Sequence, residues 1–216
     1  NMLEYPDWLH PVLLKFGFIE IRWYSLLYLL GFIFCYVSVP NLARERNLKI
    51  SEKAYDDLWI YLVVGVIGGA RLGHVILFEP LYYLNNLTQV IAIWNGGLSF
   101  QGGLVGGLMA GWFFSKKHHI SYWDLVDVFT LPISLGLAFG RWGNFTNAEL
   151  WGKLSDLPWA MHFPTTFGYR HPTQIYESLK NFLIFGVLLS LRKKLQDKPG
   201  AMSALFMIYE VWFQAS

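Results

Sequence analysis

The chain has 216 residues, of which 54% are hydrophobic and only 15% are charged, whereas an ordinary soluble domain carries about 25% charged residues. The formal net charge of +2 and the lack of a run rich in Lys and Arg exclude a typical nucleic-acid-binding protein. The chain has a single cysteine, Cys35, so it forms no internal disulfide and no cysteine-rich zinc site. We expect Cys35 to be a small buried hydrophobe, because it lies within an apolar run.

Long apolar stretches separated by short polar loops dominate the sequence. They predict membrane helices near residues 22–43, 57–78, 100–115, 123–140, 174–192 and 201–214. A membrane span needs roughly 20 mainly apolar residues, so the third and sixth helices are short. The pattern predicts an all-α polytopic membrane protein with about six transmembrane helices, folded as a single transmembrane domain over residues 1–216.

Basic residues alternate between the loops and predict the orientation of the chain. They follow the first, third and fifth helices: Arg44, Arg46, Lys49, Lys53; Lys116, Lys117; Arg192, Lys193, Lys194, Lys198. By the positive-inside rule these loops are cytoplasmic, which leaves the N-terminus and residues 79–100 and 141–173 on the outer, periplasmic side. We expect the amide-interrupted apolar segment near 80–94 to lie along the interface, and residues 153–170 to form a short periplasmic arm.

The fourth helix is predicted to end in the stretch GRWGNFTNAE, which runs from Gly140 to Glu149. Its charged residues are costly at membrane depth unless they have a function. The guanidinium of Arg141 offers a planar set of donors that suits a phosphate; the alternative is an arginine that anchors the helix end. If Arg141 acts together with Asn144 and Asn147, the three residues predict a polar cavity on the outer side that binds an anion. Glu149 either holds a proton or forms a structural pair with Arg141.

Other polar residues within or beside the predicted helices allow two interpretations each. Arg71 either lines a headgroup pocket with His74, one helical turn away, or donates to backbone carbonyls. Tyr24 is either an interfacial anchor or part of a site. His171, before the fifth helix, is either a general base or a hydrogen-bonded cap residue. No Ser-His-Asp arrangement, HExxH motif, P-loop or dinucleotide fingerprint is present in the sequence.

The third predicted helix is rich in glycine. One interpretation is that these glycines let helix backbones approach closely. The other is that some of them shape a re-entrant turn beside a cavity. The glycines concerned are Gly96, Gly97, Gly102, Gly103, Gly106, Gly107 and Gly111.

The stretch GRWGNFTNAELWG over residues 140–152 resembles the G-R-x-G-N-F-x-N-x-E signature of bacterial prolipoprotein diacylglyceryl transferases. Four further stretches are similar to that family in the same order: RWY at 22–24, GARLG at 69–73, GGLSFQGGL at 96–104 and HPTQIYE at 171–177. The similarity runs from about Trp23 to about Ala204.

The resemblance implies an enzyme of the bacterial inner membrane, usually with seven helices and with its active site toward the periplasm. Such an enzyme moves the diacylglyceryl group of phosphatidylglycerol to the lipobox cysteine of a prolipoprotein and releases glycerol phosphate. Its partners would be phosphatidylglycerol, the prolipoprotein signal peptide and membrane lipids. It would need no metal and no cofactor, and we expect a monomer.

The resemblance also implies roles for individual residues. Arg141 would bind the lipid phosphate and act in catalysis, and His171 and Arg71 fall within matched stretches. Asn144, Asn147 and Glu149 would complete the polar site, and Gly152 would keep its backbone tight. Tyr24 would line the cavity, and Gly97 and Gly102 would shape the turn at the lipid site.

Two positions depart from the family pattern. Gln101 occupies a catalytic position where the family commonly has a histidine, and glutamine takes up no proton near neutral pH. Phe213 stands where the family has the arginine of a Tyr-Gly-x-x-Arg-Phe element. These departures leave open an inactive or truncated relative that binds phospholipid or lipoprotein. A small transporter is a further alternative, although the sequence shows no inverted repeat.

Overall fold

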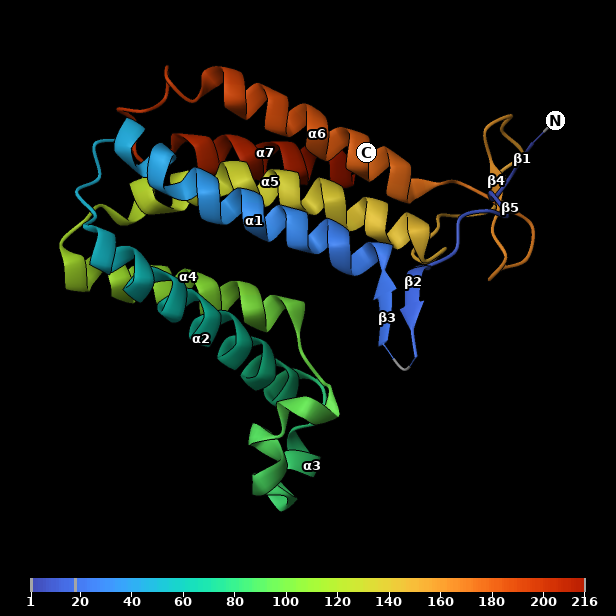
Figure 1. Cartoon of the computed structure of the whole chain (residues 1–216), viewed down its shortest axis with the longest axis horizontal. Coiled ribbons are helices and arrows are strands. Elements are labelled where there is room, and N and C mark those ends of the chain that lie inside the picture. The colour runs from blue at the N-terminus through green and yellow to red at the C-terminus, as the bar shows by residue number, and fades with distance from the viewer. Residues whose placement is uncertain (1, 18, 216) are drawn as a thin grey trace. The chain divides into compact units, whose positions relative to one another are not determined.

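The computed structural model describes residues 2–17 and 19–215, and it divides the chain into two compact units. The first unit contains the described residues up to Leu42 together with those from Asp127 onward, and the second unit is Ala43–Val126. All six predicted stretches are helical among the described residues (Figure 1), with these bounds: α1 Trp23–Glu45, α2 Glu52–Leu77, α4 Phe100–His118, α5 Tyr122–Thr146, α6 Thr173–Leu191 and α7 Ala201–Ala215. The unit boundaries fall inside α1 and α5.

Three of the described helices, α1, α2 and α5, are long and apolar enough to cross a membrane, and α7 is apolar over the shorter range Ala201–Phe213. Only 17% of the apolar window of α1 and 11% of that of α2 are buried, against 56% for α5. Apolar side chains that face away from the protein are suited to lipid and not to water. The chain is therefore a mainly helical membrane protein.

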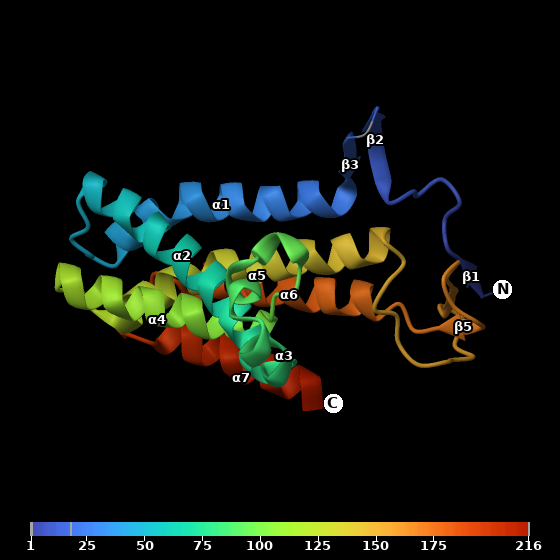
Figure 2. The same cartoon turned by 90° about the horizontal axis from the view of Figure 1, so that it is seen from below.

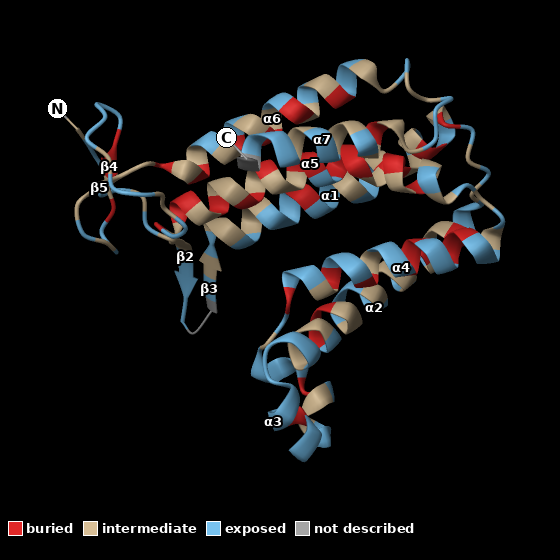
Figure 3. Ribbon diagram, turned by 180° about the vertical axis from the view of Figure 1, so that it is seen from behind, coloured by how far each residue is buried: buried red, intermediate tan, exposed pale blue. Residues whose placement is uncertain are grey.

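In the first unit, α5 is the central helix. Figure 1 shows α1 and α6 beside it, and Figure 3 shows buried residues along its length. Leu131 of α5 packs in one cluster with Ile184 and Leu188 of α6 and Met202 of α7. The Ser178 hydroxyl donates to the carbonyl of Ala138 at 3.0 Å, so a polar contact also joins α5 and α6.

An ion pair that the sequence did not indicate joins α6 to α7. Lys180 Nζ lies 2.7 Å from Glu210 Oε2, and the two side chains are only 9% and 16% exposed. A buried charge left without its partner costs several kcal/mol. The pair therefore fixes the face that α7 turns toward α6.

Short strands accompany the helices, and the described residues form them in two sheets. β2 (Val12–Phe16) and β3 (Ile19–Arg22) make an antiparallel hairpin that leads into α1 (Figure 2). β1 (Leu3–Glu4), β4 (Met161–His162) and β5 (Tyr169–Arg170) form the second sheet, in which β1 runs parallel to β4. Strands of two to five residues are too short for alternation in the sequence to indicate them.

In the second unit, α2 and α4 pack with their backbones almost in contact. A Cβ atom at Gly69 would lie 2.5 Å from the carbonyl oxygen of Gly102 and 2.7 Å from Gly106 Cα. A Cβ at Gly65 would lie 2.5 Å from Ala110 Cβ. The close-approach interpretation therefore describes the glycines of α4 that face α2.

The segment between α2 and α4 is helical in three short pieces. α3 (Pro80–Asn85) is followed by the 3₁₀ turns η1 (Leu87–Ile91) and η2 (Ile93–Asn95). Gly96 and Gly97 then turn the chain into α4 with φ angles of 81° and 74°. The turn interpretation therefore describes these two glycines.

Candidate functional site

Residues 147–152 follow α5 and complete the GRWGNFTNAELWG stretch, and we call them the signature loop. This loop carries backbone strain. Ala148 and Leu150, which flank Glu149, have φ angles of 52° and 57°, a left-handed conformation that residues other than glycine rarely adopt. Such strain persists only where the surroundings hold it. Here Thr165 Oγ1 donates to the Ala148 carbonyl at 2.7 Å, and Thr173 Oγ1 donates to the Leu150 carbonyl at 3.0 Å.

Three of the predicted site residues come together around one carboxylate, and we call Asn144, Asn147 and Glu149 the Glu149 cluster. Glu149 Oε1 accepts from Asn144 Nδ2 at 2.8 Å and from Asn147 Nδ2 at 3.3 Å. The Glu149 backbone N–H also donates to the Asn144 carbonyl at 3.1 Å. Amide donors therefore orient this carboxylate, and no cation is needed to hold it.

Arg141 pairs with a residue that the sequence reasoning missed. Its Nη2 lies 2.6 Å from Oε2 of Glu177 in α6, and not against Glu149. About a third of each side chain is exposed, 34% for Arg141 and 39% for Glu177. The guanidinium is thus oriented by one carboxylate and still accessible, which suits the binding of a second anion.

The start of α6 holds the signature loop through two further contacts. Gln174, a buried side chain, donates from Nε2 to the Glu149 carbonyl at 2.6 Å, and Thr173 donates to Leu150 as described above. Glu177 follows Thr173 by four residues and Gln174 by three, so it shares a helical face with each of them. This spacing within HPTQIYE is the feature of the sequence from which the contact with the signature loop could have been predicted.

His171 contacts Tyr176 and lies at the backbone junction between the loop and α6. Its Nδ1 is 3.3 Å from the Tyr176 hydroxyl. Its carbonyl accepts from the backbone N–H groups of Gly152 and Thr173, each at 2.9 Å. A Cβ at Gly152 would lie 2.9 Å from His171 Cβ, so the backbone is tight here.

Tyr24, in α1, packs against the last turns of α5. A Cβ at Gly143 would lie 2.7 Å from Tyr24 Cδ2, so only glycine lets this ring approach α5 so closely. The Tyr24 and Tyr28 rings are 4.6 Å apart at their centroids. The first unit therefore brings Tyr24 to the same end of α5 as the predicted polar residues.

Arg71 lies in the second unit, and its contacts match one of its two interpretations. It is buried, and among the described residues it donates to four backbone carbonyls: Gln89 at 2.5 Å, Val90 at 2.8 Å, Gly96 at 2.5 Å and Gly97 at 3.0 Å. Its guanidinium also lies over the ring of Tyr83, 5.1 Å from the centroid. This arrangement ties the segment after α3 to α2.

Gly97 and Gln101 occupy the turn into α4. A Cβ at Gly97 would lie 2.6 Å from His74 Nε2 and 2.9 Å from Arg71 Nη1, and its φ of 74° also favours glycine. Ser99 caps α4 by accepting from the Gly102 N–H at 3.2 Å, and its hydroxyl donates to Gln101 Oε1 at 3.0 Å. Gln101 itself is exposed.

In the part of the chain that the structure describes, no group of three or more His, Cys, Asp or Glu side chains is placed to hold a metal ion.

Comparison with known proteins identifies the family. The family model described as prolipoprotein diacylglyceryl transferase matches residues 11–214. The chain is 40% identical over 211 residues to the phosphatidylglycerol–prolipoprotein diacylglyceryl transferase of Bordetella avium (strain 197N), which covers 96% of this chain and 79% of that protein. Proteins of the same name from Azoarcus sp. (strain BH72) and Nitratidesulfovibrio vulgaris (strain DP4) are 40% and 37% identical, covering 96% and 98% of this chain and 79% and 81% of their own lengths. The chain belongs to the prolipoprotein diacylglyceryl transferase family.

Proposed function

We propose that this protein transfers the diacylglyceryl group of phosphatidylglycerol to the lipobox cysteine of prolipoproteins and releases glycerol phosphate. The observation that carries the proposal is the end of α5, where a partly exposed Arg141 is held by Glu177 next to the strained loop of the Glu149 cluster. A fixed and accessible guanidinium is what a phosphate ester needs when it becomes a leaving group.

The reaction is a displacement at carbon. The cysteine thiolate attacks the glyceryl carbon that bears the phosphate, and a C–S bond forms as the C–O bond to phosphate breaks. The bonding electrons leave with glycerol phosphate, whose charge Arg141 stabilises. A thiol with a pKa of about 8.5 is a few per cent ionised at neutral pH, so its proton can pass to water even though Gln101 is no base.

The remaining residues have supporting roles in this proposal. Asn144, Asn147 and Glu149 complete the polar site, Tyr24 lines it, and Gly152 keeps its backbone tight. His171 stays a candidate base, although its ring lies against Tyr176. By resemblance, Gly97, Gly102 and Gln101 act at the lipid site, and Arg71 holds the backbone that carries Gly97.

The location and orientation of the protein in the membrane are part of the proposed function. We place a monomer with about six spans in the bacterial inner membrane as a single transmembrane domain, with the end of α5 on the periplasmic side. Residues 153–170 are its periplasmic arm. The segment near 80–94 lies along the interface, which its apolar exposure supports, because Leu81, Leu87 and Ile91 are 74%, 70% and 73% exposed.

An in vitro transfer assay tests the proposal. Purified protein, phosphatidylglycerol and a lipobox peptide are combined, and mass spectrometry detects diacylglyceryl addition to the cysteine. We expect product from the natural sequence and a loss of about 100- to 1000-fold in Arg141→Ala. The matched control is Arg192→Ala, which removes an arginine from the other end of α6 and is expected to leave turnover unchanged.

Each outcome of this assay has a definite meaning. Full turnover in Arg141→Ala would remove this residue from the mechanism. Retention of phosphatidylglycerol without product in the natural sequence would favour the inactive relative that Gln101 suggests, and Gln101→His would then be expected to restore transfer.

A further inference from the structure

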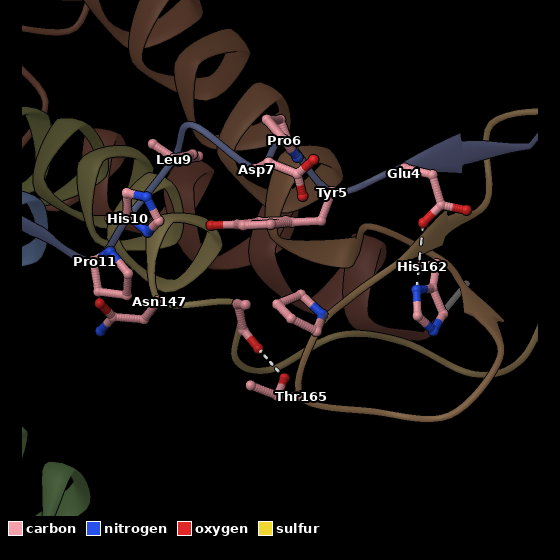
Figure 4. A pocket seen from close by; sticks show the side chains of 12 residues that line it. Glu4, Tyr5, Pro6, Asp7, Leu9, His10, Pro11, Asn147, His162 and Thr165 are labelled. Carbon is pink, nitrogen blue, oxygen red and sulfur yellow. Dashed lines mark hydrogen bonds and ion pairs between the residues drawn. The ribbon is translucent and has the colours of Figure 1, made fainter.

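A pocket of about 400 Å³ lies in the first unit beside the Glu149 cluster (Figure 4), and we call it the N-terminal pocket. It forms between the segment that joins β1 to β2, the residues that follow α5, and the residues that follow β4. Its lining residues are Glu4, Tyr5, Pro6, Asp7, Leu9, His10, Pro11, Asn147, Ala148, His162, Pro164 and Thr165. The volume is within the range of ligand-binding pockets.

The charges of the pocket disfavour a phosphate. Two carboxylates line it and no Lys or Arg does. Glu4 is already paired, with His162 Nδ1 at 3.3 Å and the Tyr169 hydroxyl at 2.6 Å. Asp7 is exposed and makes no hydrogen bond or ion pair with the other described residues. Because like charges repel, an occupant that is neutral or positively charged is favoured over an anionic lipid headgroup.

Asn147 connects the pocket to the Glu149 cluster. Its Nδ2 donates to Glu149, and its side chain lines the pocket together with Pro11 and His10 (Figure 4). Its Oδ1 is buried and has no hydrogen-bond partner among the described residues. An orphaned acceptor of this kind is costly, and a backbone N–H of a bound polypeptide is the kind of donor that would satisfy it after a small shift of the wall.

The other walls suit a polypeptide. Tyr5, Leu9 and three prolines give flat apolar surfaces between the carboxylates, which is the mixture of apolar and polar contacts that an extended peptide makes. Tyr5 is itself fixed, because its hydroxyl donates to the carbonyls of Phe145 and Thr146 at 3.0 and 3.1 Å. The pocket thus has a rigid floor at the end of α5.

We propose that the N-terminal pocket binds the acceptor polypeptide at the residues that follow its cysteine, and that Asp7 makes it prefer a neutral or cationic side chain there. The inference rests on the proposed function, because it assigns the second substrate of that reaction. It names a specificity-determining residue outside the signature loop.

The test uses lipobox peptides that differ only in the residue after the cysteine, which is Lys, Ser or Asp. We expect the KM of the Lys peptide to be about 1.5- to fivefold lower than that of the Asp peptide, as for a partly screened surface charge. Asp7→Lys should reverse this order and Asp7→Asn should abolish it, while the KM for phosphatidylglycerol stays unchanged. The matched control is Asp156→Lys, an exposed carboxylate outside the pocket, which should keep the natural order.

Equilibrium binding of the same peptides, fluorescently labelled, to the protein in nanodiscs separates this inference from the proposed function. Peptide binding that depends on Asp7 in the absence of transfer would support the pocket and refute the activity. Transfer without any dependence on the peptide's charge, or the same change in Asp156→Lys, would overturn the pocket assignment. An altered KM for phosphatidylglycerol alone in Asp7→Lys would assign the pocket to the lipid and overturn it as well.

Discussion

Adding one methyl group at Gly106 should separate α2 from α4. In the structure, a Cβ at this position would overlap the carbonyl oxygen of Gly65 and lie 2.9 Å from both the Gly65 carbonyl carbon and Gly69 Cα. These atoms belong to the backbone of α2 and cannot rotate away as a side chain can. Ordinary contact begins at about 3.4 Å, so in Gly106→Ala the helices must move apart by roughly half an ångström or more.

The magnitude follows from comparison with a control on α2. Forcing extra atoms into a packed interior costs about 1–3 kcal/mol, whereas Gly→Ala in a helix contributes about 1 kcal/mol of stability through backbone entropy. In Gly68→Ala we expect the gain from backbone entropy without the packing cost, because a Cβ at Gly68 would meet nothing within 4 Å. The helix-propensity effect cancels between the two variants, so Gly106→Ala should be less stable than Gly68→Ala by about 1–3 kcal/mol.

The free energy of unfolding is measured by denaturant titration of each variant in the same detergent micelles, followed by tryptophan fluorescence. Equal stability of the two variants would refute close backbone contact between α2 and α4. A second readout is the transfer reaction. Because α4 begins at Phe100 and carries Gln101 in its first turn, we also expect Gly106→Ala to lower turnover more than Gly68→Ala does.

Four further predictions follow from contacts at single positions. Arg71→Gln removes charge-assisted hydrogen bonds to several backbone carbonyls and should lower the free energy of unfolding by about 3 kcal/mol or more; a stability like that of the natural sequence would contradict the carbonyl contacts. Lys180→Met should cost about 3–5 kcal/mol in the same titration, whereas the double variant Lys180→Met/Glu210→Met should recover most of it; no recovery would argue against the ion pair. Leu150→Gly should raise stability by up to about 1 kcal/mol, because relief of the left-handed φ outweighs the entropy of glycine and the side chain is 60% exposed; a clear loss would show that its φ is not strained. Gln101→His should add an inflection near pH of about 6.5 to the pH–rate profile, and a profile parallel to that of the natural sequence would exclude a base at this position.

The sequence allowed the helices to be predicted because a membrane helix is a local property. About 20 apolar residues satisfy the membrane core without reference to the rest of the chain. The six helices were therefore found, with ends that differ by up to six residues. The GRWGNFTNAE motif likewise indicated that polar side chains gather at the end of α5, because charge inside or beside a membrane helix is rare enough to be informative.

The partners of the charged residues were decided by tertiary structure. Arg141 had a carboxylate nearby in sequence, Glu149, yet it pairs with Glu177 from another helix. Arg71 had two interpretations, and only the path of the chain after α3 placed four carbonyls around it. A guanidinium binds whichever acceptor the packed backbone brings within about 3 Å, and sequence distance does not encode that geometry.

The sequence by itself thus determined the class of this protein, its helices and the family to which it belongs, because hydropathy and a long motif are both written in consecutive residues. Only the tertiary structure decided how the end of α5 is held, with Thr173, Gln174 and Glu177 reaching the signature loop from α6. It also decided that an N-terminal pocket lies against Asn147. Both depend on segments far apart in the chain meeting at one place, which is a consequence of packing and not of local composition.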